Sequence, residues 1–222
     1  MTVRGSAIEA RVFGAFLFDM DGTILSSIAA AERVWTHWAE RHGLDVAAFL
    51  PTIHGVRAVD TIRRLELPGV DAEREAEALT RAEIEDVEGV EPIAGATAFL
   101  SSLPTDRWAI VTSAPRDLAR ARLAAAHIPP PAVLVTAEDV TRGKPQPDCY
   151  LFAAWKLGRD VRQCLIFEDA AAGIRAAEAT GAAVAVVSAT HSRPLVTHHF
   201  TVASFDDLQL QVDEVGLRLV DR

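Results

Sequence analysis

The chain has 222 residues, half of them hydrophobic, which is enough for one large domain or for a core domain that carries a smaller insertion. Its formal net charge of −9 at pH 7 argues against nucleic acid or an anionic membrane as its main partner. An anionic small molecule stays possible, because a local cation or a bound metal can override the mean charge.

Five short apolar runs, most of them rich in β-branched or aromatic residues, predict buried strands. In chain order they are Phe13–Phe18, Trp108–Thr112, Val133–Thr136, Leu165–Phe167 and Ala183–Val187. Helical patterns lie between them, at Ala96–Leu103, Arg116–Ala126, Cys149–Leu157 and Ala170–Thr180. This alternation predicts an α/β fold, a Rossmann-like doubly wound parallel sheet with helices on both faces. The last stretch, Phe205–Arg222, fits a helix start followed by an edge strand.

The interval between residues 28 and 90 has helical patterns and no convincing strand. Apolar and aromatic residues recur at helical spacing in Ala29–His42, and Arg57–Leu67 is a second segment of this kind. Glu73–Glu88 mixes acidic and basic residues, which predicts a helix with a solvated face. We therefore predict a small α-helical cap at residues 27–91, inserted after the first strand of a core formed by residues 1–26 and 92–222.

The first predicted strand ends in two carboxylates, Asp19 and Asp21, followed by Gly22. Open α/β sheets bind their ligands at the carboxyl ends of their strands. There Asp19 can act as a carboxylate nucleophile, and Asp21 can transfer a proton to or from the reacting group. Gly22 lets the backbone turn sharply beside the ligand.

Polar residues also follow other predicted strands, and in a parallel sheet these ends lie on one edge. Ser113 follows the second strand, Lys144 lies in a Gly-Lys-Pro loop, and Glu168 and Asp169 follow the fourth strand. Lys144 and Ser113, with Ala114 beside it, are suited to hold phosphate oxygens. The carboxylates of Asp19, Glu168 and Asp169 supply hard oxygen ligands of the kind that Mg²⁺ prefers.

These residues resemble the four signatures of the haloacid dehalogenase-like hydrolase superfamily. The match consists of the DxDGT motif at Asp19–Thr23, Ser113, Lys144 in GKPxPD, and the Glu168-Asp169 pair, and it spans nearly the whole chain. The resemblance implies that Asp19 forms an aspartyl-phosphate, and that Asp21 is the acid/base. It also implies a Mg²⁺ site formed by Asp19, Glu168, Asp169 and the backbone carbonyl of Asp21.

The helical insertion resembles the cap of the β-phosphoglucomutase and sugar-phosphatase group. The segment His54–Thr61 is similar to the cap loop that meets the substrate in phosphatases of small sugar and polyol phosphates. This makes His54 and Arg57 candidate substrate-binding residues. The resemblance implies a Mg²⁺-dependent phosphatase that hydrolyses a small phosphorylated sugar, polyol or related metabolite.

Two alternatives stay open. A β-phosphoglucomutase-like mutase of phosphosugars is the nearer one, although this chain has Ala31 where the mutase carries a cap histidine. A non-catalytic phospho-accepting signalling receiver shares the sheet, the acceptor aspartate, the hydroxyl and the lysine, but has no helical insertion after the acceptor strand. A dehalogenase is disfavoured by Asp21, because dehalogenases lack this second aspartate.

Several other polar and aromatic residues have a structural interpretation. Trp35 fits the core of the cap better than a sugar platform, Thr112 fits a strand end, and Arg116 fits a surface helix as well as an anion contact. Three histidines are interpreted as surface loop residues: His191, His198 and His199.

The two cysteines, Cys149 and Cys164, do not form a CxxC pair. We interpret them as free buried thiols rather than a disulfide, which is typical of a cytoplasmic protein. No stretch approaches the roughly 18 apolar residues of a membrane-spanning helix. We therefore expect a cytoplasmic monomer with no nucleic-acid or membrane partner.

Overall fold

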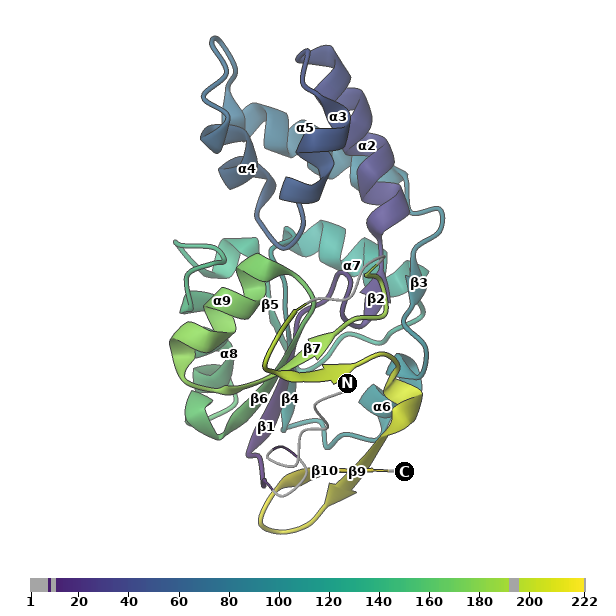
Figure 1. Cartoon of the computed structure of the whole chain (residues 1–222), viewed down its shortest axis with the longest axis vertical. Coiled ribbons are helices and arrows are strands. Elements are labelled where there is room, and N and C mark those ends of the chain that lie inside the picture. Colours follow the sequence, from purple (N-terminus) through teal and green to yellow (C-terminus); the bar gives the residue numbers. More distant parts are fainter. Residues whose placement is uncertain (1–7, 9–10, 192–195, 222) are drawn as a thin grey trace.

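A computed structural model describes every residue except 1–7, 9–10, 192–195 and 222. Within the described chain, six parallel strands form one sheet in the order β5-β4-β1-β6-β7-β8 (Figure 1). This confirms the predicted α/β class. The strands are β1 (Ala15–Phe18), β4 (Trp108–Val111), β5 (Val133–Val135), β6 (Cys164–Glu168), β7 (Ala183–Val187) and β8 (Phe200–Val202). The sequence did not predict β8, a three-residue strand in a polar, histidine-rich segment.

The central strand β1 fixes the position of the predicted catalytic pair. It pairs with β4 on one side and with β6 on the other, and all four of its side chains are buried. The backbone N–H of Asp19 continues the ladder by donating to the carbonyl oxygen of Phe167 at 2.9 Å. Asp19 is therefore held at the same sheet edge as the ends of β4 and β6.

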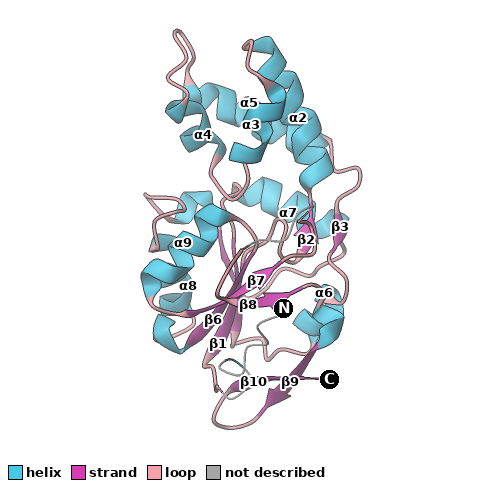
Figure 2. Ribbon diagram, viewed as in Figure 1, coloured by secondary structure: helices cyan, strands magenta, loops and turns pink. Residues whose placement is uncertain are grey.

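Two apolar layers cover the sheet, because side chains alternate along a strand. Phe16 and Phe18 belong to a cluster that includes residues of α6 (Ala96–Ser101) and α7 (Arg116–Ala125). Ala15 and Leu17 belong to the opposite layer, with residues of α8 (Asp148–Lys156) and α9 (Ala171–Thr180). The helices lie on both faces (Figure 2), so the sheet is doubly wound as expected.

A separate helical unit stands over the carboxyl edge of the sheet (Figure 1). It contains α2 (Ile28–Arg41), α3 (Val46–Phe49), the 3-10 helix η1 (Leu50–Thr52), α4 (Ala58–Arg64) and α5 (Ala72–Glu85). Trp35, Trp38 and Phe49 lie in its own apolar cluster. The chain enters and leaves it through the paired short strands β2 (Leu25–Ser26) and β3 (Glu91–Pro92). We call this unit the cap; its boundaries at residues 27 and 91 stay a prediction.

Two segments differ from the expectation. In α5 the side chains of Leu79 and Glu83 are buried, although we expected mainly solvated charge there. The C-terminal stretch begins with a 3-10 turn, η4 (Phe205–Asp207), and continues as a hairpin of β9 (Leu208–Val212) and β10 (Leu217–Asp221). The predicted helix start corresponds to η4, and two strands follow it instead of one, paired with each other in a separate two-stranded sheet; Arg222 lies outside the described residues.

Two further 3-10 helices complete the described elements, η2 (Ala137–Asp139) and η3 (Val161–Gln163). Both cysteines are free and buried, as predicted. Within the described residues, no helix has the length and apolar character needed to cross a membrane.

Phe16 tests the aromatic layer that supports β1. Its ring is fully buried among Phe13, Phe18, Phe99 and Phe167, with centroid separations of 5.6 to 6.3 Å. We expect Phe16→Ala to lower the free energy of unfolding by about 3–5 kcal/mol, because it leaves a cavity in a packed layer.

Urea unfolding followed by tryptophan fluorescence measures this loss. Trp155→Ala is the control, because that side chain is 69% exposed. A loss for Phe16→Ala no larger than for Trp155→Ala would contradict the importance of this layer.

Candidate active site

The strand ends bring together four of the predicted site residues, all of them buried. Asp19 follows β1, Glu168 ends β6 with Asp169 directly after it, and Lys144 enters from the loop between η2 and α8. One carboxylate oxygen from each of Asp19, Glu168 and Asp169 lies within 4.8 Å of the other two. Residues separated by up to 150 positions therefore form one charged cluster.

Lys144 is the cation at the centre of this cluster. Its ammonium Nζ donates to Asp19 Oδ1, to Glu168 Oε1 at 2.7 Å and to the carbonyl oxygen of Val111 at 3.3 Å. The same nitrogen lies 5.1 Å from the centre of the Tyr150 ring. An ammonium group has three donors, and these three oxygens fix its position.

Glu168 holds Lys144 in place. Its Oε1 accepts from Lys144 and from the Tyr150 hydroxyl at 2.8 Å, and its Oε2 accepts from the backbone N–H groups of Asp169 (2.9 Å) and Ala170 (3.1 Å). A carboxylate has about four lone-pair sites, and here all of them are used. The carboxylate also packs against Gly173, where a Cβ atom would lie 1.5 Å from Oε1. The metal-ligand role predicted for Glu168 stays a prediction.

The cluster contains three carboxyl groups and only one ammonium group, so Lys144 does not balance its negative charge. Burial raises the pKa of Asp19 to about 7; Lys144 opposes this rise, while Glu168 and Asp21 add to it. Burial and the charge of Glu168 also raise the pKa of Asp169 well above its ordinary range. Burial alone would lower the pKa of Lys144, but Asp19 and Glu168 raise it above its usual value. A divalent cation bound to these oxygens would relieve the repulsion, so the residues present fit Mg²⁺.

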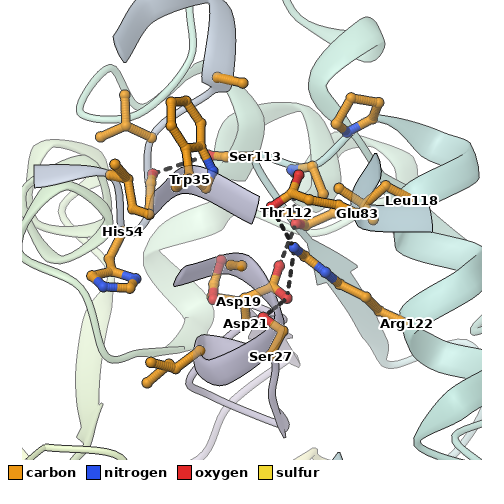
Figure 3. A pocket seen from close by; sticks show the side chains of 18 of the residues that line it. Asp19, Asp21, Ser27, Trp35, His54, Glu83, Thr112, Ser113, Leu118 and Arg122 are labelled. Atoms are coloured by element: carbon orange, nitrogen blue, oxygen red, sulfur yellow. Dashed lines mark hydrogen bonds and ion pairs between the residues drawn. The ribbon is translucent and has the colours of Figure 1, made fainter. Parts of the chain in front are cut away.

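Asp21 faces a pocket between the cap and the core (Figure 3). Its Oδ1 accepts from the Ser27 hydroxyl at 2.6 Å and from Arg122 Nη1 at 3.0 Å, and Thr112 Oγ1 lies 3.5 Å from its Oδ2. Arg122 also donates through Nη2 to Glu83 Oε1 at 3.0 Å. Sequence reasoning missed Ser27, Glu83 and Arg122.

The sequence signals for Arg122 and Glu83 are weak. Arg122 and Glu83 are two among several charged residues in their amphipathic helical patterns, which normally place charge in solvent. Thr112, predicted as a strand end, indeed follows β4, and its hydroxyl also contacts Asp21 and accepts from the Ala114 N–H at 3.0 Å.

Three predicted binding residues line this pocket: Ser113, Ala114 and His54. The Ser113 hydroxyl donates to the carbonyl oxygen of Gly55 in the cap at 3.0 Å. His54 Nε2 lies 3.5 Å from a Glu32 carboxylate oxygen. Their phosphate- and substrate-binding roles stay predictions, but their positions are compatible with them.

Arg57 occupies a different position from the one expected for a substrate ligand. Its Nε donates to Asp60 at 2.6 Å, and its Nη1 donates to the carbonyl oxygen of Val140 at 3.3 Å. Its side chain also covers Gly143, where an added Cβ would lie 2.6 Å from Arg57 Nε. Arg57 therefore fastens the cap to the loop that carries Lys144, and its predicted contact with substrate stays untested.

The other polar and aromatic candidates have mixed outcomes. Trp35 packs in the cap core, 5.6 Å from Trp38 between ring centres, and also lines the pocket. Arg116 pairs with Asp139 at 2.7 Å on the helix surface. The histidines lie in connecting segments but make contacts: His191 Nε2 is 3.0 Å from the Asp169 carbonyl oxygen, and His199 Nε2 is 2.8 Å from Glu178, with His198 alongside.

Comparison with known proteins supports the motif assignment. A family model described as haloacid dehalogenase-like hydrolase matches residues 13–181. Hexitol phosphatase A of Escherichia coli (strain K12) is 43% identical over 183 residues, which cover 81% of this chain and 85% of that protein. 2-Deoxyglucose-6-phosphate phosphatase 1 of Saccharomyces cerevisiae is 30% identical over 201 residues, which cover 81% of this chain and 82% of that protein.

Similarity to solved structures points the same way. A hydrolase from Pseudomonas syringae superposes with a TM-score of 0.68 at 26% identity, over 78% of this chain and 84% of that chain. The resemblance inferred from the four motifs is therefore confirmed by sequence and by fold.

The raised pKa of Asp19 predicts how stability depends on pH when metal is removed. The folded protein favours protonated Asp19, because its pKa rises from 3.8 to about 7. The resulting stability is fully present below about pH 4 and is lost as the pH rises to about 7, an effect of the order of 4 kcal/mol. Urea unfolding in EDTA at several pH values measures this loss.

Asp19→Asn removes this titrating group and should reduce the loss of stability between pH 4 and 7, while Asp169, whose pKa is also raised, retains its own share. Asp106→Asn, at a largely exposed position, should leave the curve unchanged. Parallel curves for wild type and Asp19→Asn would show that burial does not raise the pKa of Asp19.

Proposed function

Because this chain belongs to the haloacid dehalogenase-like hydrolase family, we propose that it is a Mg²⁺-dependent phosphatase of small phosphorylated sugars, polyols or related metabolites. One observation carries the proposal: Asp19 and Asp21 line the same cap-covered pocket as Ser113, and Lys144 is bonded to Asp19. The names of the relatives, hexitol phosphatase A and 2-deoxyglucose-6-phosphate phosphatase 1, support the substrate class.

The residues divide the reaction into two transfers. In the first, a carboxylate oxygen of Asp19 forms a bond to phosphorus while the bond from phosphorus to the leaving-group oxygen breaks, and Asp21 donates its proton to that oxygen. In the second, Asp21 takes a proton from water as the water oxygen attacks phosphorus, and the bond to Asp19 breaks. Inorganic phosphate and the free alcohol are the products.

Lys144 and Ser113 hold the transferred group during both steps. The ammonium of Lys144 already lies against Asp19, so it can stabilise the negative charge on the phosphoryl oxygens without moving far. The Ser113 hydroxyl, which donates to Gly55 of the cap, can donate to a phosphoryl oxygen instead.

Mg²⁺ would be held by Asp19, Asp169 and the backbone carbonyl of Asp21. Glu168, the fourth predicted ligand, would bind the ion in place of one of its four present donors. Its charge would neutralise the phosphate and the buried carboxylates, and so let Asp19 approach phosphorus. Asp169 is positioned for this role by Thr23, whose hydroxyl donates to Asp169 Oδ1 at 3.3 Å. Gly22 lies so close to Asp169 that an added Cβ would be 2.1 Å from its Oδ2.

The mutase alternative receives less support from the pocket. Ala31 lines it at the place where the mutase resemblance would require a histidine. We also propose a cytoplasmic monomer that acts on metabolites rather than on nucleic acid or membranes. The buried free thiols support the compartment, and the negative net charge supports the choice of partner.

Phosphate release tests the proposed activity. With Mg²⁺, wild type should release phosphate from p-nitrophenyl phosphate and from a panel of hexitol, hexose and glycerol phosphates, and EDTA should abolish the release. Asp19→Asn should lower kcat by at least about 10⁴-fold, because it removes the nucleophile. Asp106→Asn, an exposed change of the same kind, should retain wild-type turnover. No release from any substrate would refute the proposal.

A time course separates the phosphatase from the mutase. Purified protein with a hexose phosphate should yield one phosphate for each sugar consumed, because water takes the phosphoryl group from Asp19. We expect no positional isomer of the hexose phosphate in the products, by chromatography or ³¹P NMR. Accumulation of an isomer without free phosphate would instead establish the mutase.

A further inference from the structure

A buried ion pair joins the cap to the core beside the proposed acid/base. Glu83 comes from α5 of the cap and Arg122 from α7 of the core, and each has a relative exposure of 6%. Arg122 Nη2 donates to Glu83 Oε1 at 3.0 Å, while its Nη1 donates to Asp21 Oδ1 at 3.0 Å. Figure 3 shows the guanidinium of Arg122 directed toward Asp21. Neither residue belongs to the motifs on which the family resemblance rests.

The position of Asp21 places the pair on the leaving-group side of the pocket. A residue that protonates the leaving-group oxygen must come within hydrogen-bond distance of it. Arg122 contacts Asp21 directly, and Glu83 is the next group beyond Arg122. Both line the pocket together with Asp19 and Ser113. This places the two side chains where the carbon chain of a leaving group can contact them.

The charges at this end do not favour an anion. Arg122 contributes one positive charge and Glu83 one negative charge, and Asp21 is neutral while it holds the proton that it donates to the leaving group, so this end has no positive excess. Burial raises the pKa of Glu83, and the ion pair with Arg122 at 3.0 Å opposes the rise by stabilising the carboxylate form. A site built for a second phosphate or a carboxylate would carry an excess of cations instead.

The same pair can recognise hydroxyl groups. A carboxylate has about four lone-pair sites and a guanidinium has five N–H donors, more than the ion pairs in this structure use. One hydroxyl of the ligand can donate to Glu83 while the adjacent hydroxyl accepts from Arg122. This arrangement suits adjacent hydroxyls on a neutral carbon chain.

We propose that Glu83 and Arg122 determine leaving-group specificity: they bind the hydroxyls of a neutral polyol or sugar, and Glu83 rejects substrates with a second anionic group. This inference rests on the proposed phosphatase function. It extends that function by naming the residues that discriminate among phosphorylated metabolites. The property that they discriminate is the charge at the end of the substrate distant from the phosphate.

Two ligands that differ at one carbon test the proposal. Sorbitol 6-phosphate ends in an alcohol at C1, and 6-phosphogluconate has a carboxylate there. Each is measured as a competitive inhibitor of p-nitrophenyl phosphate hydrolysis with Mg²⁺. Wild type should bind sorbitol 6-phosphate more tightly than 6-phosphogluconate. Glu83→Gln should lower the ratio of the inhibition constant of 6-phosphogluconate to that of sorbitol 6-phosphate at least about tenfold, equivalent to about 1.4 kcal/mol.

Glu85→Gln is the matched control, since it makes the same charge change at an exposed position on the same helix. It should leave the ratio within about twofold of wild type, because exposed charges are screened by salt. If Glu83→Gln does not turn over p-nitrophenyl phosphate, calorimetric titration of the same two ligands gives the ratio directly.

The outcomes separate this inference from the proposed function. Failure of wild type to release phosphate from p-nitrophenyl phosphate and from every substrate of the panel would refute the phosphatase function and the inference with it. Normal hydrolysis combined with equal ratios in wild type and Glu83→Gln would overturn the specificity role alone. Tighter binding of 6-phosphogluconate than of sorbitol 6-phosphate by wild type would also overturn it.

Discussion

The burial of three carboxylates around one ammonium group is the constraint on which the rest of this structure depends. Two carboxylates about 4 Å apart repel by roughly 4 kcal/mol at an effective dielectric near 20. Asp19, Glu168 and Asp169 are nevertheless held together, because strands β1 and β6 are adjacent and end at the same level. Lys144 offsets part of the repulsion, and the remainder makes the cluster a receptive site for a divalent cation and a phosphoryl group.

The surrounding residues make this arrangement rigid rather than adaptable. Glu168 is saturated by Lys144, Tyr150 and two backbone N–H groups, so it cannot turn away to reduce the repulsion. The Glu168 carboxylate fills the space beside Gly173, so any side chain at position 173 would collide with it. A fixed cluster of this kind stabilises charge that develops in a reaction better than a flexible one, because no reorganisation is needed when the charge appears.

The sequence predicted the core of the site better than its periphery, for a physical reason. Asp19 and Glu168 lie at the ends of apolar strands, and parallel strands must end at a common edge, so their meeting follows from the sheet alone. Lys144 comes from a loop and was predicted from its Gly-Lys-Pro motif. Arg122 and Glu83 belong to helices whose charged residues usually face solvent. Their burial depends on how the cap packs against α7, which hydrophobic periodicity does not encode. Likewise β8 is too short for a periodic signal, and the C-terminal hairpin depends on the pairing partner that β9 finds.

The contacts between cap and core link the position of the cap to the chemistry beneath it. Arg57 of the cap binds the Val140 carbonyl in the segment that leads to Lys144, the Gly55 carbonyl accepts from Ser113, and Glu83 pairs with Arg122 beside Asp21. Each contact therefore ends on, or next to, one of the groups proposed to hold phosphate or to transfer a proton. A displacement of the cap would have to break these bonds and would leave Arg122 buried with one carboxylate partner fewer. The cap thus contributes to the electrostatics of the site as well as covering it. The guanidinium of Arg122 both positions Asp21 and takes part in the proposed selection of the leaving group.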